Sequence, residues 1–538
     1  MPFSRDTAAT AALHKIADIL TIRGERGYIV GGFIRDRLLG RSTNDVDIAV
    51  RGDALAAARE VAAAIGGTFV LLDDVSQIAR VVVTEEGHQE EELRSAQWYF
   101  DFSSFSGDIE SDLARRDFTI DAMAFELNRP ATGRSHGDSL IATGAGAPDL
   151  AQIRSGLIDP FYGQEDLRRK IVRRVSDAIF DVDAIRLLRA VRLAAELDFT
   201  IEPGTERLIR SCAGAITGVA GERIREELLH LLRLPQAAHH LRYMDELGLL
   251  LELIPELAEA KGVEQPTVHY WDVFEHSLQT VAALEFLLRE GEWQHGNRDM
   301  RETAPWSEEI DRHLSRQLSG GSNHRVLLKL AALLHDVAKP LTKTIDDTGR
   351  ARFIGHTRVG AAMAVDILAR LRFSNREIGL METMVYHHLR PAQMTDGDLP
   401  SQRAIYRYFR DTEDAGVDIL LLALADYLAS RGPLVSVDEW KQHCRLMNYI
   451  IAEHEKQSAK LAPMKLLNGH DIMREFGLEP GPRVGELMAM VHEAQASGEV
   501  SSREEAFALV RNEVSETDDR QAKHRSDPKF HDEESIVE

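Results

Sequence analysis

Two aspartates, Asp45 and Asp47, stand two residues apart in DVDIAV, an apolar run that predicts a strand. Side chains at positions i and i+2 of a strand point to the same face, so the two carboxylates would lie side by side. Such a pair suits Mg²⁺, which activates an attacking hydroxyl and stabilises a pyrophosphate leaving group. Asp101, at the end of the apolar run WYFDF, is a candidate third carboxylate, or a residue that only caps its strand.

A glycine pair precedes these aspartates in the segment YIVGGFIRD. An apolar strand leads into Gly31 and Gly32, and a helix that carries Arg35 follows. Glycines at a strand-to-helix turn let a phosphate approach backbone N–H groups at a helix N-terminus, where the helix dipole also favours an anion. Arg35 would add positive charge. Each piece alone is common in other roles, but their order within residues 31–47 indicates a nucleotidyl-transfer site.

That order, G-G-x-x-R-D followed by D-x-D, resembles the first motif of the nucleotidyltransferase superfamily of DNA polymerase beta. More specifically, it resembles the class II tRNA nucleotidyltransferases and bacterial poly(A) polymerases. The segment DLARRDFTIDAMAF, residues 112–125, is similar to the family's second motif, which implies that Arg116 contacts the incoming nucleotide. Asp121 stands where many members have Asn, a change that we expect to be tolerated. Residues 158–167 are similar to the third motif, a hinge between head and neck.

Residues 180–192, FDVDAIRLLRAVR, resemble the family's base-reading helix, whose pattern is E-D-x-x-R. The resemblance implies that side chains select the incoming base without a nucleic-acid template. Helical spacing would place four of them along one side of the helix: Asp183, Arg186, Arg189 and Arg192. The family's Glu is Val182 here, and the direction in which this difference would alter base selection stays open. Without the upstream motifs, the same pattern would indicate an amphipathic helix with a solvated basic face. Residues 221–232 resemble the fifth motif, a neck helix that supports the base-reading one.

The second half of the chain carries histidines and aspartates within helical text, which together suit a divalent transition metal. This set resembles the HD phosphohydrolase superfamily, with four residues at the basic ligand positions: His276, His335, Asp336 and Asp426. His356 and one of the pair His387/His388, of which we favour His388, match positions that two-metal members add. The resemblance implies a phosphatase or phosphodiesterase activity, but the metal and the substrate stay open.

The elements that position these residues follow two patterns. Strand-like and helical runs alternate through the first 125 residues, and from about residue 165 the text is almost all amphipathic helix. With the resemblance, this predicts an α+β fold: a polymerase-beta-like head of mixed α/β structure, a helical neck, an HD domain and a helical tail. The expected bounds are 1–150 for the head, 151–262 for the neck, 263–435 for the HD domain, 436–515 for a tRNA-binding region and 516–538 for a disordered acidic tail.

Composition limits the class of protein. The 538 residues carry a formal net charge of −23, which argues against a uniformly cationic nucleic-acid or membrane binder, so any RNA site must be a local basic patch. No run of apolar residues is long enough for a membrane span. Two cysteines cannot build a disulfide scaffold, and the N-terminus has no secretory pattern, so we expect a cytoplasmic protein.

We therefore expect a Mg²⁺-dependent enzyme that adds C, C and A from CTP and ATP to tRNA 3′ ends, with a second, metal-binding HD site. Poly(A) polymerase and A-only addition are the alternatives within the family. C-only addition is disfavoured, because residues 47–116 leave room for the flexible loop that C-only members are thought to shorten. An alternative of another class is an HD phosphohydrolase with a nucleotide-sensing head. The oligomeric state stays open.

Overall fold

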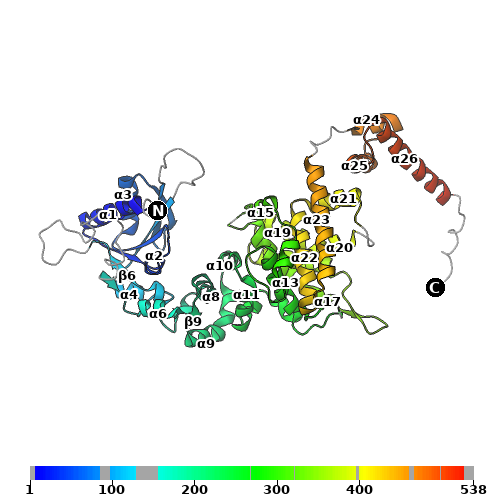
Figure 1. The fold of residues 1–538 in the computed structure, drawn as a ribbon. Helices are drawn as coiled ribbons and strands as arrows, with labels where there is room; N and C mark the ends of the chain where they lie inside the picture. The colour runs from blue at the N-terminus through cyan, green and yellow to red at the C-terminus, as the bar shows by residue number, and fades with distance from the viewer. Residues whose placement is uncertain are drawn as a thin grey trace, which may run out of the picture. The chain divides into compact units, whose positions relative to one another are not determined.

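The computed structural model describes residues 6–84, 97–128, 156–266, 268–319, 321–394, 399–459, 466–496 and 498–525. The chain divides into two compact units: residues 1–234 with 240–255, and residues 235–239 with 256–538. In Figure 1 the strands of the main sheet lie in the blue and cyan part of the chain, whereas the green-to-red part is helical except for one small hairpin. The prediction of a mixed α/β head followed by helical regions is confirmed.

Seven strands form the sheet of the head, in the order β3-β4-β5-β2-β1-β6-β7. They are β1 (Arg26–Val30), β2 (Asp45–Arg51), β3 (Thr68–Asp73), β4 (Ile78–Thr84), β5 (Gln97–Ser104), β6 (Ala124–Glu126) and β7 (Leu157–Ile158). β2 and β5 run parallel, whereas the other neighbouring pairs are antiparallel. The parallel pair lies in the middle of the sheet, so polar side chains on these two strands meet there.

Short helices cover the sheet: α1 (Asp6–Ile22), α2 (Gly32–Leu38), α3 (Ala54–Ile65) and α4 (Ile109–Leu113), with the 3₁₀ turn η1 (Thr119–Asp121). α3 packs on β4 and β5 through its alanine-rich side, because small side chains let a helix approach a sheet closely. Asp53 caps it by accepting a hydrogen bond from the Ala56 N–H at 2.9 Å, and Gly66 ends it in the left-handed region at φ 70°. α2 lies against η1, which joins the first and second sequence motifs.

The neck consists of α6 (Gly163–Arg169), α7 (Ile179–Val182), α8 (Arg186–Leu197), α9 (Pro203–Cys212), α10 (Gly221–Arg233), α11 (Ala237–Glu246) and α12 (Leu249–Leu253). α8 and α10 pack together, with apolar residues of both helices buried. Two short strands that the sequence did not predict, β8 (Ile171–Val172) and β9 (Thr200–Ile201), pair in parallel and hold the segment before α7 to the segment after α8.

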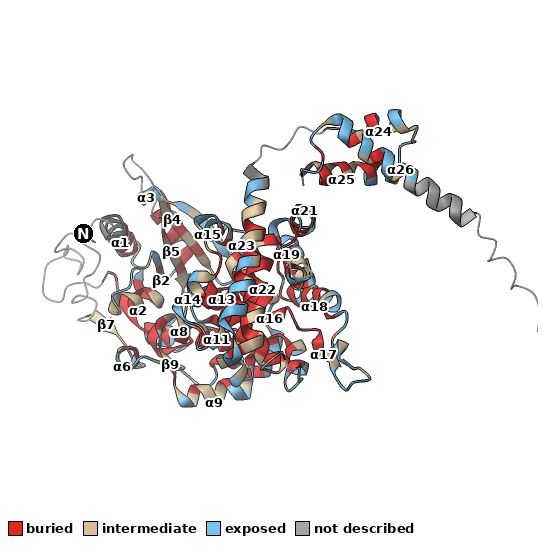
Figure 2. Cartoon of the chain, turned by 45° about the vertical axis from the view of Figure 1, so that its right-hand side comes forward, coloured by how far each residue is buried: buried red, intermediate tan, exposed pale blue. Residues whose placement is uncertain are grey.

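The second unit is built of helices around a buried centre: α13 (Val273–Leu287), α14 (Arg298–Thr303), α15 (Glu308–Ser315), α16 (His324–Leu334), α17 (Lys339–Thr342), α18 (His356–Arg370), α19 (Asn375–His387), α20 (Arg390–Gln393), α21 (Gln402–Thr412) and α22 (Gly416–Arg431). α13 packs against α16 and α22, and Figure 2 shows buried residues along these helices. A small hairpin, β10 (Thr344–Ile345) and β11 (Ala351–Arg352), precedes α18.

The chain ends in α23 (Val437–Ala459), α24 (Gly469–Phe476), α25 (Pro482–Ala496) and α26 (Arg503–Arg525). The last three share an apolar cluster of their own, which includes Ile472, Leu487 and Val510. α26 continues past residue 516 to Arg525, and no Pro or Gly interrupts it. The expected disorder from residue 516 stays a prediction. The rest of that predicted tail lies outside the described residues.

Candidate active sites

The parallel pairing of β2 and β5 brings the predicted carboxylates together. Asp47 lies directly opposite Asp101 in the register, and Asp45 lies two residues before Asp47 on the same face of β2. On the far side of β5, Arg80 of β4 is paired with Asp101, and its Nε and Nη2 donate to the two carboxylate oxygens at 2.7 Å each. The head therefore presents three neighbouring carboxylates, one of which is neutralised by an arginine.

The protonation of Asp47 reflects this crowding. Solvent reaches the side chain of Asp47 from one side, but protein atoms surround the rest of it. This burial, together with Asp101 and other nearby carboxylates, raises the pKa of Asp47 to about 6, although the positive charge of Arg116 opposes the shift. Burial and Asp101 also raise the pKa of Asp45. Crowded carboxylate oxygens of this kind are relieved by a divalent cation, and an all-oxygen donor set is the one that Mg²⁺ prefers. The residues present fit a Mg²⁺ site.

Gly31 connects the carboxylates to the second motif. Its φ of 70° lies in the left-handed region, and a Cβ at this position would lie 2.9 Å from a guanidinium nitrogen of Arg116 and 3.0 Å from Oδ2 of Asp47. Any side chain would therefore displace both groups. Gly32 begins α2, where a Cβ would lie 3.2 Å from Nη2 of Arg35.

The guanidinium of Arg35 is committed inside the head. Arg35 is 7% exposed, and it pairs through Nη1 with Asp121 at 2.8 Å and through Nε with Asp36 at 3.0 Å. Asp121 is equally buried, which explains why an acid instead of an amide is useful at this position. Arg35 thus joins α2 to η1, and a contact between Arg35 and a triphosphate stays a prediction.

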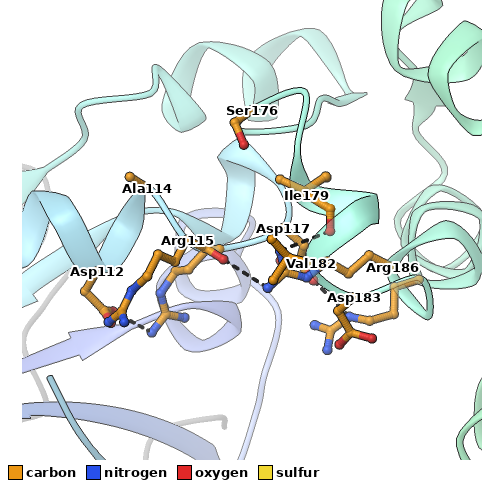
Figure 3. A pocket seen from close by; sticks show the side chains of 11 residues that line it. Asp112, Ala114, Arg115, Asp117, Ser176, Ile179, Val182, Asp183 and Arg186 are labelled. Atoms are coloured by element: carbon orange, nitrogen blue, oxygen red, sulfur yellow. Dashed lines mark hydrogen bonds and ion pairs between the residues drawn. The ribbon is translucent and has the colours of Figure 1, made fainter. Parts of the chain in front are cut away.

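A pocket of about 560 Å³ opens between the second motif and the base-reading segment. Figure 3 shows it, and its lining includes Arg116, Asp183, Arg186 and Arg189 of the sequence prediction together with Arg115 and Asp117. The sequence prediction also included Arg192. It is not part of this lining, and it pairs with Glu227 at 2.6 Å and Glu196 at 2.8 Å.

The spacing predicted that all four base-reading residues lie on one helix, but in the structure they do not. α8 begins at Arg186, whereas Asp183 lies in the preceding turn with extended backbone (φ −155°), where its carboxylate can accept from the N–H of Ile185. An Asx turn of this kind competes with helix, which is the physical reason for the difference. Arg186 donates to the backbone oxygen of Arg115 at 2.9 Å, so one wall of the pocket is fastened to the other.

The HD residues converge on one point in the second unit. Nε2 of His276 lies 3.2 Å from Nε2 of His335, 3.4 Å from Asp336 and 3.1 Å from Asp426. Asp336 is the common neighbour of the remaining two, with His356 at 3.5 Å and His388 at 3.8 Å. Of the two adjacent histidines, His388 therefore belongs to the cluster, whereas the ring of His387 lies against Tyr386.

The donor set of this cluster fits a transition metal. Oδ1 of Asp336 and Nε2 of His356 and of His388 are buried without a hydrogen-bond partner, whereas Oδ2 of Asp336 lies 2.6 Å from Nζ of Lys339. Burial lowers the pKa of His388 to about 4, which keeps its imidazole neutral. Burial alone would raise the pKa of Asp336, but His335 and the Lys339 ammonium, 2.6 Å away, outweigh it and hold that pKa well below its usual range. Neutral imidazoles and ionised carboxylates are the forms that ligate.

Another cluster of histidine and aspartate, formed by His313, His324 and Asp418, is explained by hydrogen bonding alone. Oδ2 of Asp418 lies 2.8 Å from Nε2 of His313 and 3.0 Å from Nδ1 of His324. A guanidinium nitrogen of Arg316 donates to Nε2 of His324 at 2.9 Å, so Nδ1 carries the proton and donates to Asp418. That tautomer cannot ligate a metal through Nδ1, and the cluster is structural.

Four residues near the carboxylates and the pocket were missed by the sequence reasoning: Arg80, Arg115, Asp117 and Arg223. A charged residue among the apolar residues of IARVVVT was the available signal for Arg80. Arg115 and Asp117 flank the predicted Arg116, and Asp117 pairs with Arg189 at 2.9 Å. Arg223 lies in the fifth motif, where only a supporting role was expected. Its guanidinium donates to the carboxylate of Asp183, and no local sequence pattern indicates this pairing.

Three parts of the chain match models of known protein families. Residues 27–173 match the poly A polymerase head domain, residues 198–261 match a model described as the probable RNA and SrmB-binding site of polymerase A, and residues 273–431 match the HD domain. An A-adding tRNA nucleotidyltransferase of Deinococcus radiodurans is 34% identical over 91% of this chain and 96% of its own length. The chain belongs to the tRNA nucleotidyltransferase family.

Other tRNA nucleotidyltransferases are similar over most of their length. A CC-adding tRNA nucleotidyltransferase of Thermus thermophilus is 31% identical over 90% of this chain and 92% of its own length. The solved structure of a CCA-adding enzyme with ATP superimposes with a TM-score of 0.59 at 21% identity, covering 95% of this chain and 99% of that one, and this likeness shows the fold. Among the described helices of this tRNA nucleotidyltransferase, none is long and apolar enough to cross a membrane.

Proposed function

We propose that this tRNA nucleotidyltransferase adds C, C and A to tRNA 3′ ends from CTP and ATP without a nucleic-acid template, in the cytoplasm. The observation that carries the proposal is the pocket that joins Arg116, next to Asp47, to the hydrogen-bonding residues Asp183 and Arg186. A nucleotide in that position would have its phosphates at the carboxylates and its base at side chains that can read it.

Asp45 and Asp47 would hold Mg²⁺, with Asp101 as the candidate third carboxylate. The metal would supply Lewis-acid activation of the attacking RNA 3′-hydroxyl and neutralise the departing pyrophosphate. Arg116 would orient the triphosphate so that the α-phosphate lies in line with the hydroxyl. Arg35 supports the turn at Gly31 and Gly32 from inside the head, through Asp36 and Asp121.

The Watson–Crick edges explain which bases such a pocket accepts. Cytosine and adenine each carry an exocyclic amine beside a ring nitrogen acceptor, whereas uracil and guanine carry a carbonyl at the equivalent position. The Asp183 carboxylate can accept from the amine, and Arg186 can donate to the ring nitrogen. Burial would raise the pKa of Asp183, but the Arg223 guanidinium outweighs it and lowers that pKa, so the carboxylate is ionised at neutral pH and accepts only.

A-only addition is the second candidate within the family, because the relative that is 34% identical over 91% of this chain is an A-adding tRNA nucleotidyltransferase. The assay that separates the candidates supplies labelled CTP and ATP separately to tRNAs that end before, within and after CCA. Ordered C, C, A addition that stops supports the proposal. Addition of a single A after CC would favour A-only addition, long A tails would favour poly(A) polymerase, and no incorporation would refute all three.

For the second unit we propose a metal-dependent phosphohydrolase activity of the HD cluster. The convergence of its imidazoles and carboxylates on one point supports a divalent metal held by four residues, His276, His335, Asp336 and Asp426. His356 and His388, whose Nε2 atoms are buried without a partner, are available for a second ion. The metal would supply an activated water.

The double variant Asp45→Ala/Asp47→Ala should lose nucleotide incorporation and retain hydrolysis of a generic phosphoester such as bis-p-nitrophenyl phosphate. Loss of both activities would contradict two independent sites, and retained incorporation would contradict the proposed metal carboxylates.

A further inference from the structure

We propose that Arg223 of α10 is a specificity-determining positioning residue, which holds the Asp183 carboxylate in the orientation that reads the incoming base. This inference rests on the proposed function of the pocket. Arg223 is not one of the pocket-lining residues, and it reaches Asp183 from the neighbouring helix.

The pairing has the geometry that fixes an orientation. Nη1 of Arg223 donates to Oδ1 of Asp183 at 3.1 Å, and Nη2 donates to Oδ2 at 2.7 Å, so each oxygen has its own partner. A bidentate fork of this kind restrains rotation of the carboxylate plane, which a single hydrogen bond or a lysine cannot do. Asp183 needs such a restraint, because it precedes α8 in an extended turn, where the contact with the Ile185 N–H at 3.4 Å is too weak to fix the carboxylate.

The pairing also leaves room for a base. An ionised carboxylate offers about four acceptor positions, and Arg223 uses one on each oxygen. The N–H of Ile185 lies 3.4 Å from Oδ1, a weaker contact that leaves Oδ2 with a free position. An exocyclic amine can therefore bind Asp183 while Arg223 stays in place, and the arginine need not be displaced for the site to work.

Val182 explains why this support comes from another helix. The position before the aspartate holds an acid in the family pattern, but the valine here is 73% exposed at the pocket and offers no polar atom. The other two carboxylates of the lining already have arginine partners within it, since Asp117 pairs with Arg189 and Asp112 with Arg115. The ion-pair partner of Asp183 is Arg223, which lies outside the lining.

Loss of the bidentate pairing should weaken discrimination between bases more than it slows the chemical step. In Arg223→Lys the positive charge remains but the bidentate geometry is lost, so we expect kcat/KM for CTP and ATP to fall about tenfold, mainly through KM. The values for UTP and GTP should stay near the wild-type background, because those bases do not use the carboxylate as an acceptor. Arg233→Lys at the other end of α10 is the matched control and should leave all four values unchanged.

The decisive measurement combines steady-state incorporation, on a tRNA lacking CCA for CTP and on a tRNA ending in CC for ATP, with calorimetric binding of CTP, ATP and UTP in Ca²⁺, where no turnover is needed. In the Asp183→Asn background, Arg223→Lys should add no further loss of discrimination. An equal loss for all four nucleotides in Arg223→Lys, or additive losses in the double variant, would overturn the inference. If the wild type binds CTP and ATP selectively but incorporates neither, the proposed function fails, whereas the binding series still tests Arg223.

Discussion

Replacement of Arg35 by Met separates two roles that this arginine could have. The sequence motif assigns Arg35 to the triphosphate, whereas in the structure its guanidinium lies between Asp121 at 2.8 Å and Asp36 at 3.0 Å and is 7% exposed. Loss of one partner of a buried ion pair costs about 3–5 kcal/mol, because the remaining carboxylates are left without a counter-charge. At the lower limit, local opening of the head should become about a hundredfold more frequent.

Hydrogen exchange followed by mass spectrometry on the full chain measures that opening directly, in peptides that cover α2 and η1. Arg41→Met is the matched control, since Arg41 is an exposed arginine that pairs with Glu196 at 3.3 Å, and such surface pairs contribute about 0–1 kcal/mol. Asp121→Asn should cost less than Arg35→Met, because Arg35 keeps Asp36. If Arg35→Met exchanges at wild-type rates while KM for ATP rises tenfold or more, the internal role is refuted and the triphosphate role stands.

Other residues give outcomes of a similar kind. Arg80→Gln removes a positive charge beside Asp101, so the carboxylate cluster should bind Mn²⁺ about threefold to tenfold more tightly by electron paramagnetic resonance; weaker binding would contradict the pairing. His335→Ala should remove the metal of the second unit, measured by elemental analysis, without loss of nucleotide incorporation. Burial would raise the pKa of Glu493, but hydrogen bonds from Arg407 and Arg403 outweigh burial and lower it. The contact by which Glu493 attaches α25 to α21 is therefore complete above the unfolded pKa of about 4.3 and is lost as the pH falls below that value. Glu493→Gln should therefore increase the radius of gyration at pH 7, measured by X-ray scattering, and acid should do the same in the wild type. An unchanged radius in the variant would argue against that contact.

The elements with a clear period could be predicted from the sequence. The strands around Asp47 and Asp101 follow from their apolar runs, and the motif spacing places most of the candidate site. β3 was missed because it is an edge strand, whose exposed Val70 and Leu71 do not show a one-sided pattern. Local spacing also could not show that Asp183 leaves the helix, since an Asx turn and a helical turn use the same residue types.

Pairings between distant residues could not be predicted in the same way. Arg35 has two acids within reach of its guanidinium, and one of them is 86 residues away along the chain. Arg223 and Asp183 are separated by 40 residues and meet only because α8 and α10 pack together. In both cases the partner is chosen by tertiary packing, which a single sequence does not reveal.

The pocket of Figure 3 has a consequence for the dependence of this enzyme on ionic strength. Its lining carries the aspartates Asp112, Asp117 and Asp183 against the arginines Arg115, Arg116, Arg186 and Arg189, so it is close to electroneutral. Salt screens long-range attraction between charged partners, but it has little effect on short hydrogen bonds inside such a balanced site. Added salt should therefore weaken capture of the polyanionic tRNA while the choice between bases stays the same. A change in the salt content of the cell would then alter how often this enzyme acts on tRNA, but not which nucleotides it adds.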